Sequence, residues 1–164
     1  MATRRRKFYG WGYEGDTVSD AEVAEFERAW TKLLGVDSFV PIPFPTESEI
    51  ELRSSRVSIP ASLTAFCTGD RYERLYHTYG AGTVDVALAL RREFRNPPDV
   101  VAFPRGEQDV FDLFDWCGRN SYALVPYGGG TSVVGGVNPP DHDRYRGIVT
   151  VSVGLSGSVS TRLV

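Results

Sequence analysis

The 164-residue sequence is poor in the residues that build metal and disulfide sites. It has two cysteines, Cys67 and Cys117, and two histidines, His77 and His142. The cysteines lie far apart, without Cys-x-x-Cys spacing, so we expect two buried, reduced thiols in helical surroundings. Neither histidine has a second ligand at helical or hairpin spacing, and the two aspartates flanking His142 are expected to be solvated. The sequence therefore predicts no metal site.

Long apolar runs and an extended basic surface are also missing. No segment has the uninterrupted apolar length needed to span a bilayer. The formal net charge is −3 and the basic residues are scattered, which argues against a nucleic-acid partner. The exception is Arg4-Arg5-Arg6-Lys7, but the chain turns polar soon afterwards instead of continuing into the apolar run of a secretion signal. We expect a solvated basic tail on a cytoplasmic protein without a membrane span.

What the sequence does have is a glycine-rich loop directly after an apolar, strand-like segment. Three consecutive glycines, 128–130, are followed by two hydroxyl residues, and glycine lets successive N–H groups converge on a phosphate. The loop has no lysine, which a P-loop requires. Val133 replaces the third glycine of a dinucleotide loop, and the segment after it is a poor helix. The sequence predicts a loop that binds an anion through its own amides; the alternative is a strand connection without a ligand.

Three segments together resemble the FAD-binding domain of the vanillyl-alcohol oxidase and p-cresol methylhydroxylase type. They are the approach at 96–104, the acidic helix at 107–120 and the loop at 126–132. Within that superfamily the chain resembles the FAD-linked oxidases related to alkyldihydroxyacetonephosphate synthase, for which Tyr9-Gly10-Trp11-Gly12-Tyr13 is a second signal. The resemblance implies that the FAD pyrophosphate is held by the loop residues Pro126, Tyr127, Gly128, Gly129, Gly130, Thr131 and Ser132. Covalent flavins in this superfamily are often tethered to histidine, and none lies beside the loop, so we expect non-covalent FAD.

The expected fold class is α+β, in three parts. Residues 1–95 are expected to form a helical extension, with a helix that begins after the Ser19-x-x-Glu22 capping box and ends at Gly35. Residues 96–153 read as strand, helix, strand, loop and strand, the first half of the FAD-binding domain: a small sheet with flanking helices. The last strand, 148–153, is expected to be an unpaired edge. Residues 154–164 read as an aberrant or truncated tail.

The resemblance implies that the parent protein is an FAD-dependent oxidoreductase acting on a small-molecule substrate, and it allows a homodimeric parent. Two alternatives stay open. One is a flavoprotein transferase like alkyldihydroxyacetonephosphate synthase, and the other is a non-catalytic nucleotide-binding fragment. The isolated chain is expected to be inactive, and no catalytic residue can be named from this sequence.

Overall fold

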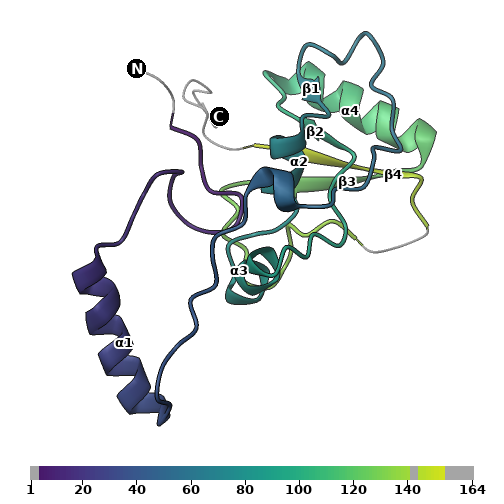
Figure 1. Cartoon of the computed structure of the whole chain (residues 1–164). Helices are drawn as coiled ribbons and strands as arrows, with labels where there is room; N and C mark the ends of the chain where they lie inside the picture. The colour runs from purple at the N-terminus through teal and green to yellow at the C-terminus, as the bar shows by residue number, and fades with distance from the viewer. Residues whose placement is uncertain (1–3, 141–143, 154–164) are drawn as a thin grey trace.

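The computed structural model describes residues 4–140 and 144–153, so the expectations for 154–164 and for the aspartates flanking His142 lie outside the described residues. The fold is α+β, as expected, with a small sheet and flanking helices (Figure 1). In chain order the elements are α1 (Asp20–Leu34), the 3-10 turn η1 (Glu47–Glu49), β1 (Cys67–Thr68), α2 (Arg71–Tyr76), α3 (Thr83–Leu90), β2 (Val100–Ala102), α4 (Glu107–Asn120), β3 (Tyr122–Tyr127) and β4 (Gly147–Ser152).

The four strands are ordered β1-β2-β4-β3, so the last strand in the sequence lies inside the sheet. Val149 of β4 pairs with Val100 on one side and with Leu124 on the other, in parallel register with both strands. The expectation that 148–153 forms an unpaired edge is therefore wrong, because the chain crosses over through α4 and returns between its own earlier strands. The carboxyl ends of β2, β3 and β4 consequently lie at the same edge of the sheet.

One face of the sheet is covered by α4, whose side chains at Leu113 and Cys117 pack against Val100 and Val149. Leu113 is fully buried, which contributes about 2 kcal/mol relative to exposure. The opposite face is covered near its carboxyl edge by the end of α2, where the ring of His77 lies 4.5 Å from that of Tyr127. The two faces alternate along each strand, as period-2 geometry requires.

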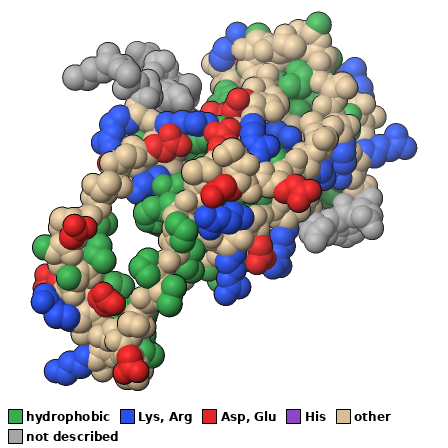
Figure 2. All heavy atoms as spheres, in the orientation of Figure 1, with side chains coloured by type: hydrophobic (Ala, Val, Ile, Leu, Met, Phe, Trp, Pro, Cys, Tyr) green, Lys and Arg blue, Asp and Glu red, His purple; other side chains and the backbone are tan. Residues whose placement is uncertain are grey.

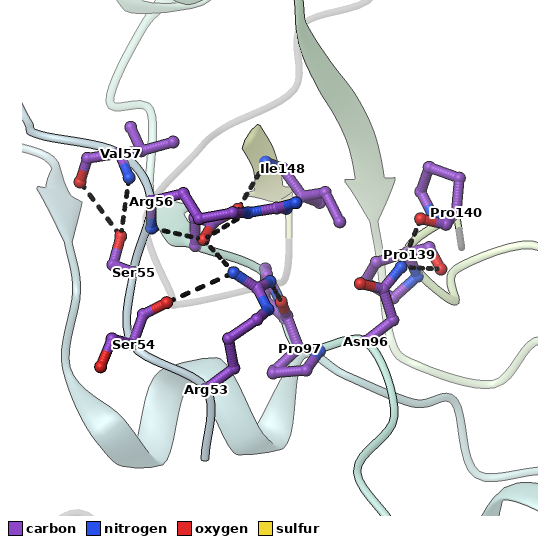
Figure 3. A network of polar contacts seen from close by, with 12 residues as sticks. Arg53, Ser54, Ser55, Arg56, Val57, Asn96, Pro97, Pro139, Pro140 and Ile148 are labelled. Atoms are coloured by element: carbon purple, nitrogen blue, oxygen red, sulfur yellow. Dashed lines mark hydrogen bonds and ion pairs between the residues drawn. The ribbon is translucent and has the colours of Figure 1, made fainter. Parts of the chain in front are cut away.

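A buried carboxylate ties the segment before β1 to the amino ends of β2 and β4 (Figure 3). Asp99 is fully buried and accepts hydrogen bonds from Arg53 at 2.6 Å, from Arg56 at 2.7 Å and from the Ile148 amide at 2.8 Å. Burial alone would raise the pKa of Asp99, but the hydrogen bonds from Arg56 and Arg53 outweigh it and hold the pKa below its ordinary value. This network stabilises the sheet at the edge opposite the glycine loop.

Helix α1 has the predicted bounds, with the capping box at Ser19 and Glu22 and a left-handed Gly35 (φ 65°) after its last residue. None of its residues is buried, although its apolar positions recur at helical spacing. It projects from the sheet, and hydrophobic side chains gather along it and the extended segment beside it (Figures 1 and 2). The exposed apolar side chains of this arm include Val23, Phe26, Trp30, Leu33, Leu34, Phe39, Ile42 and Phe44.

Candidate functional site

The predicted binding loop follows β3 at the carboxyl edge of the three parallel strands. Pro126 and Tyr127 belong to β3, so the loop itself begins at Gly128. Gly128, Gly129 and Thr131 are exposed, Ser132 is half-buried and Gly130 is buried. Ligands of open parallel sheets bind outside the carboxyl ends of the strands, where neighbouring connections diverge. The loop therefore stands where the topology leaves room for a ligand.

The loop presents a run of backbone donors without protein acceptors. Within residues 4–140 and 144–153, no hydrogen bond uses the amide N–H of any residue from 128 to 132. Two of the loop's acceptors do have protein partners. The Ala81 amide donates to the Gly130 carbonyl at 2.7 Å, and the Gly136 amide donates to Ser132 Oγ at 2.9 Å. Unpaired backbone donors favour an anion, so the loop offers donors of the kind that an anion requires.

The three glycines have different reasons for lacking a side chain. Gly130 has φ +69°, and a Cβ there would lie 2.5 Å from the Tyr127 hydroxyl, so the protein itself requires this glycine. A Cβ on Gly128 would meet nothing within 4 Å, and one on Gly129 would meet only Thr131 Cγ2 at 3.7 Å. Neither residue has a positive φ. The open space above Gly128 and Gly129 fits a ligand that approaches the main chain.

A second segment with glycines, Gly80-Ala81-Gly82, packs against the backbone of the loop. A Cβ on Gly80 would lie 2.9 Å from the Ser132 carbonyl oxygen, so only glycine lets the two segments approach this closely. The hydroxyl of Tyr127 lies 3.1 Å from the Tyr76 carbonyl and 2.9 Å from the Tyr79 carbonyl. Burial raises the pKa of Tyr127, which keeps the hydroxyl protonated and able to donate. Tyr127 therefore positions the loop from the strand, whereas Pro126 is an exposed residue of β3.

A cavity of about 300 Å³ opens beside the loop, a volume at the lower end of the range for small-molecule sites. Residues from the carboxyl ends of all three parallel strands contribute to its wall, and α2 and the N-terminal segment close it. The lining residues are Arg6, Tyr72, Glu73, Tyr76, His77, Phe103, Gly128, Gly129, Ser152 and Val153. Loop and cavity thus form one site.

His77 is a buried, neutral wall of this cavity. Its Nδ1 lies 2.8 Å from the Glu73 carbonyl oxygen, and its Nε2 has no partner in the described part of the chain. Burial lowers the pKa of His77 to about 4, although the hydrogen bond to Glu73 acts in the opposite direction. The imidazole is uncharged at pH 7, so its 3.5 Å contact with the Glu73 carboxylate is not an ion pair there.

The basic N-terminal segment borders the cavity through Arg6. Its residues Arg4, Arg5 and Arg6 are exposed, in line with the expected solvation, but the segment is folded and is not a free tail. Residues 6–13 form a hairpin closed by a bridge between Arg6 and Tyr13. Trp11 Nε1 donates to the Ala81 carbonyl at 3.0 Å, so the tryptophan of the aromatic motif holds the segment that supports the glycine loop. Buried Phe8 anchors the hairpin in a core cluster. Sequence reasoning noted this motif only as a family signal and missed its role.

The two cysteines are free and buried, as predicted. Burial raises the pKa of Cys67 to about 11 and that of Cys117 to about 12, so both are unreactive thiols. Cys67 lies in β1 and not in helical surroundings. Across residues 4–140 and 144–153 no group of three potential metal ligands occurs. In the same described ranges, no helix combines the length and apolar character that a membrane crossing requires.

Comparisons with known proteins show which proteins this chain is similar to. No protein-family profile matches the chain. An alkyldihydroxyacetonephosphate synthase of Trypanosoma brucei brucei is 31% identical over 88 residues, which cover 54% of this chain and 14% of that protein. A solved structure of alkyldihydroxyacetonephosphate synthase superposes with a TM-score of 0.69 at 21% identity, covering 90% of this chain and 32% of that one.

The chain is related to the alkyldihydroxyacetonephosphate synthases. The likeness to alkyldihydroxyacetonephosphate synthase in fold extends over most of the chain, from the N-terminal region to the sheet, while the chain spans about a third of the solved structure. A mitochondrial D-lactate dehydrogenase (cytochrome) of Arabidopsis thaliana is also similar, with 37% identity over 68 residues, covering 42% of this chain and 11% of that protein. The chain is thus similar to enzymes of two different reaction types.

Proposed function

We propose that residues 128–132 hold the diphosphate of non-covalent FAD, as part of a FAD-linked enzyme. The observation that carries the proposal is the run of five amide N–H groups without acceptors in the described structure, beside two glycines whose Cβ positions are open. Amides converging on one point stabilise a phosphate without a helix dipole or a lysine. The resemblance of the loop and its approach to the FAD-binding domain supports FAD as the diphosphate.

Each residue of the loop has a distinct part in this site. Gly128 and Gly129 let a phosphate oxygen reach the main chain, and the exposed Thr131 hydroxyl adds a donor. Ser132 Oγ accepts from the Gly136 amide, which leaves its own hydrogen to donate. Tyr127 holds the loop in place from β3 and does not contact the ligand. When bound, the flavin supplies hydride or electron transfer, and this chain supplies the anchor.

For the whole enzyme we propose a cytoplasmic FAD-dependent oxidoreductase acting on a small organic substrate, a chemistry supported by the similarity to D-lactate dehydrogenase. The similarity to alkyldihydroxyacetonephosphate synthase favours a second candidate, a transferase that exchanges an acyl for an alkyl group without net redox change. Anaerobic mixing of the whole flavoenzyme with candidate 2-hydroxy acids separates them. Bleaching of the flavin absorbance by one of these acids supports the oxidoreductase, and unchanged absorbance supports the transferase.

The cradle is tested by comparing FAD with riboflavin, which has the same ring but no diphosphate. We expect the chain to bind FAD more tightly than riboflavin, and Gly129→Val to abolish this preference while the far-UV circular dichroism stays unchanged. Gly118→Val is the matched control, because a Cβ there meets nothing within 4 Å and α4 covers the opposite face of the sheet. Full retention of FAD by Gly129→Val would show that the loop is not the cradle.

A further inference from the structure

The glycine loop has donors but no positive charge of its own. Its five free amides are neutral dipoles, no lysine or arginine lies within 128–132, and no helix begins at Ser132. A diphosphate carries about two negative charges near neutral pH. A cation at the rim of a cradle that holds such an anion would therefore add affinity that the amides alone do not supply.

We propose that Arg6 is the cation that faces the anion held by the glycine loop, and that the N-terminal hairpin is the second wall of this site. The inference rests on the proposed binding of a diphosphate by the loop. Arg6 and Gly129 both line the 300 Å³ cavity, and both also line the adjoining cavity of about 30 Å³. The arginine therefore shares both cavities with Gly129 of the loop.

Arg6 differs from the two arginines before it in having no carboxylate partner within the described part of the chain. Arg4 pairs with Asp16, and Arg5 pairs with Glu47 at 2.8 Å. The Arg6 guanidinium lies beside the Tyr13 ring, with 5.6 Å between Arg6 Cζ and the ring centroid. A guanidinium with free N–H donors is suited to bidentate contact with phosphate oxygens.

The backbone of Arg6 is held firmly enough to aim this side chain. Its carbonyl accepts a hydrogen bond from the Tyr72 hydroxyl at 2.9 Å, and the neighbouring Lys7 amide donates to Gly12 at 3.1 Å. Trp11 joins the far side of the hairpin to Ala81, whose amide in turn binds the Gly130 carbonyl. Hairpin and loop are thus connected through one shared residue, which keeps their spacing fixed.

The test is an isothermal calorimetric titration of the 164-residue chain with inorganic pyrophosphate, ADP and adenosine. Each titration is carried out at two salt concentrations. We expect Arg6→Gln to weaken pyrophosphate and ADP binding about tenfold at low salt, to reduce the salt dependence, and to leave adenosine binding unchanged. Arg6→Lys should recover part of the loss. Arg4→Gln removes the same charge from the same segment but belongs to the Asp16 pair, so its affinities should stay within about twofold of the wild type.

A second measurement keeps the test valid if Arg6→Gln does not fold. In the wild-type chain, the Nε–Hε resonance of Arg6 should shift on addition of pyrophosphate, whereas that of Arg4 should not. Unchanged pyrophosphate affinity in Arg6→Gln, an equal loss in Arg4→Gln, or a static Arg6 resonance during saturation would overturn the inference. If pyrophosphate binds through Arg6 but FAD does not bind, the cation stands and the FAD proposal fails. If FAD binds equally well without Arg6, the FAD proposal stands and the inference about Arg6 fails.

Discussion

The hydroxyl of Tyr127 occupies the place that a Cβ on Gly130 would need, at 2.5 Å. The same hydroxyl bonds the carbonyls of Tyr76 and Tyr79, so the strand before the loop and the segment after α2 meet under the third glycine. Of the three glycines, Gly130 is therefore required by the fold, whereas Gly128 and Gly129 have free space at their Cβ positions.

Gly130→Ala is therefore expected to destabilise the fold. The alanine must adopt φ near +69°, and its Cβ must displace the Tyr127 hydroxyl, which together cost about 1–3 kcal/mol. Chemical denaturation of this variant beside Gly128→Ala measures the difference. Gly128 has open space and no positive φ, so its variant should match the wild type in stability. Equal stabilities for the two variants would contradict the assignment of roles within the loop.

Stability should fall with acid because of His77. Its pKa is lowered from 6.5 to about 4 in the folded chain, so below pH 6.5 the unfolded chain binds a proton that the folded chain does not. The stabilisation present above pH 6.5 is lost as the pH falls towards 4, by at most about 3 kcal/mol. Urea unfolding at several pH values, compared between the wild type and His77→Phe, checks this. A constant difference between the two across pH 4–7 would show that His77 is not buried and neutral.

Asp99→Asn should lower the stability of the fold more than the loss of an exposed ion pair does. Asp99 lies at the edge of the sheet opposite the site. The substitution leaves Arg53 and Arg56 without their buried carboxylate, which costs about 3 kcal/mol. The exposed pair of Asp115 and Arg119 on α4 provides a control, because Asp115→Asn should change the unfolding midpoint little. Similar midpoints for the two variants would mean that the network of Figure 3 does not hold the sheet together.

FAD bound at this site should be released by acid or heat denaturation, because no histidine adjoins the loop in the sequence. His77, which lines the cavity together with Gly128 and Gly129, is the side chain to examine as a tether if this expectation fails. Denaturing electrophoresis followed by flavin fluorescence checks this in the flavin-loaded whole enzyme. Fluorescence that migrates with the polypeptide, and that maps to a peptide from this chain, would contradict non-covalent binding.

The sequence predicted well whatever depends on local signals. The capping box and Gly35 set the bounds of α1, and the apolar positions of α4 set the helix that covers the sheet. It failed where distant residues decide the structure. The place of β4 between β2 and β3 depends on a crossover, and β1 consists of two residues that gain their conformation from pairing with Val101 and Ala102.

The same limit applies to the site. The glycine loop could be predicted because consecutive glycines mark it locally in the sequence. The cavity wall could not, because its residues come from segments far apart in the sequence. Arg6 reaches it through a hairpin whose contacts with Tyr72 and Ala81 span more than 60 positions. His77 gave no signal, since a single histidine has the same appearance in a solvated helix and in a buried wall. The domain division at residue 95 stays a prediction.

The central claim is that the free amides of residues 128–132 bind a diphosphate, and amide chemical shifts during a titration test it most directly. The contacts described here come from one loop and one arginine, so we expect the 164-residue chain to bind FAD with a dissociation constant weaker than micromolar, within the range that such a titration measures. The account predicts that, on addition of FAD or pyrophosphate, the largest shifts occur at the amides of Gly128, Gly129, Gly130, Thr131 and Ser132. Saturating shifts elsewhere in the chain, with these five amides unchanged, would contradict it.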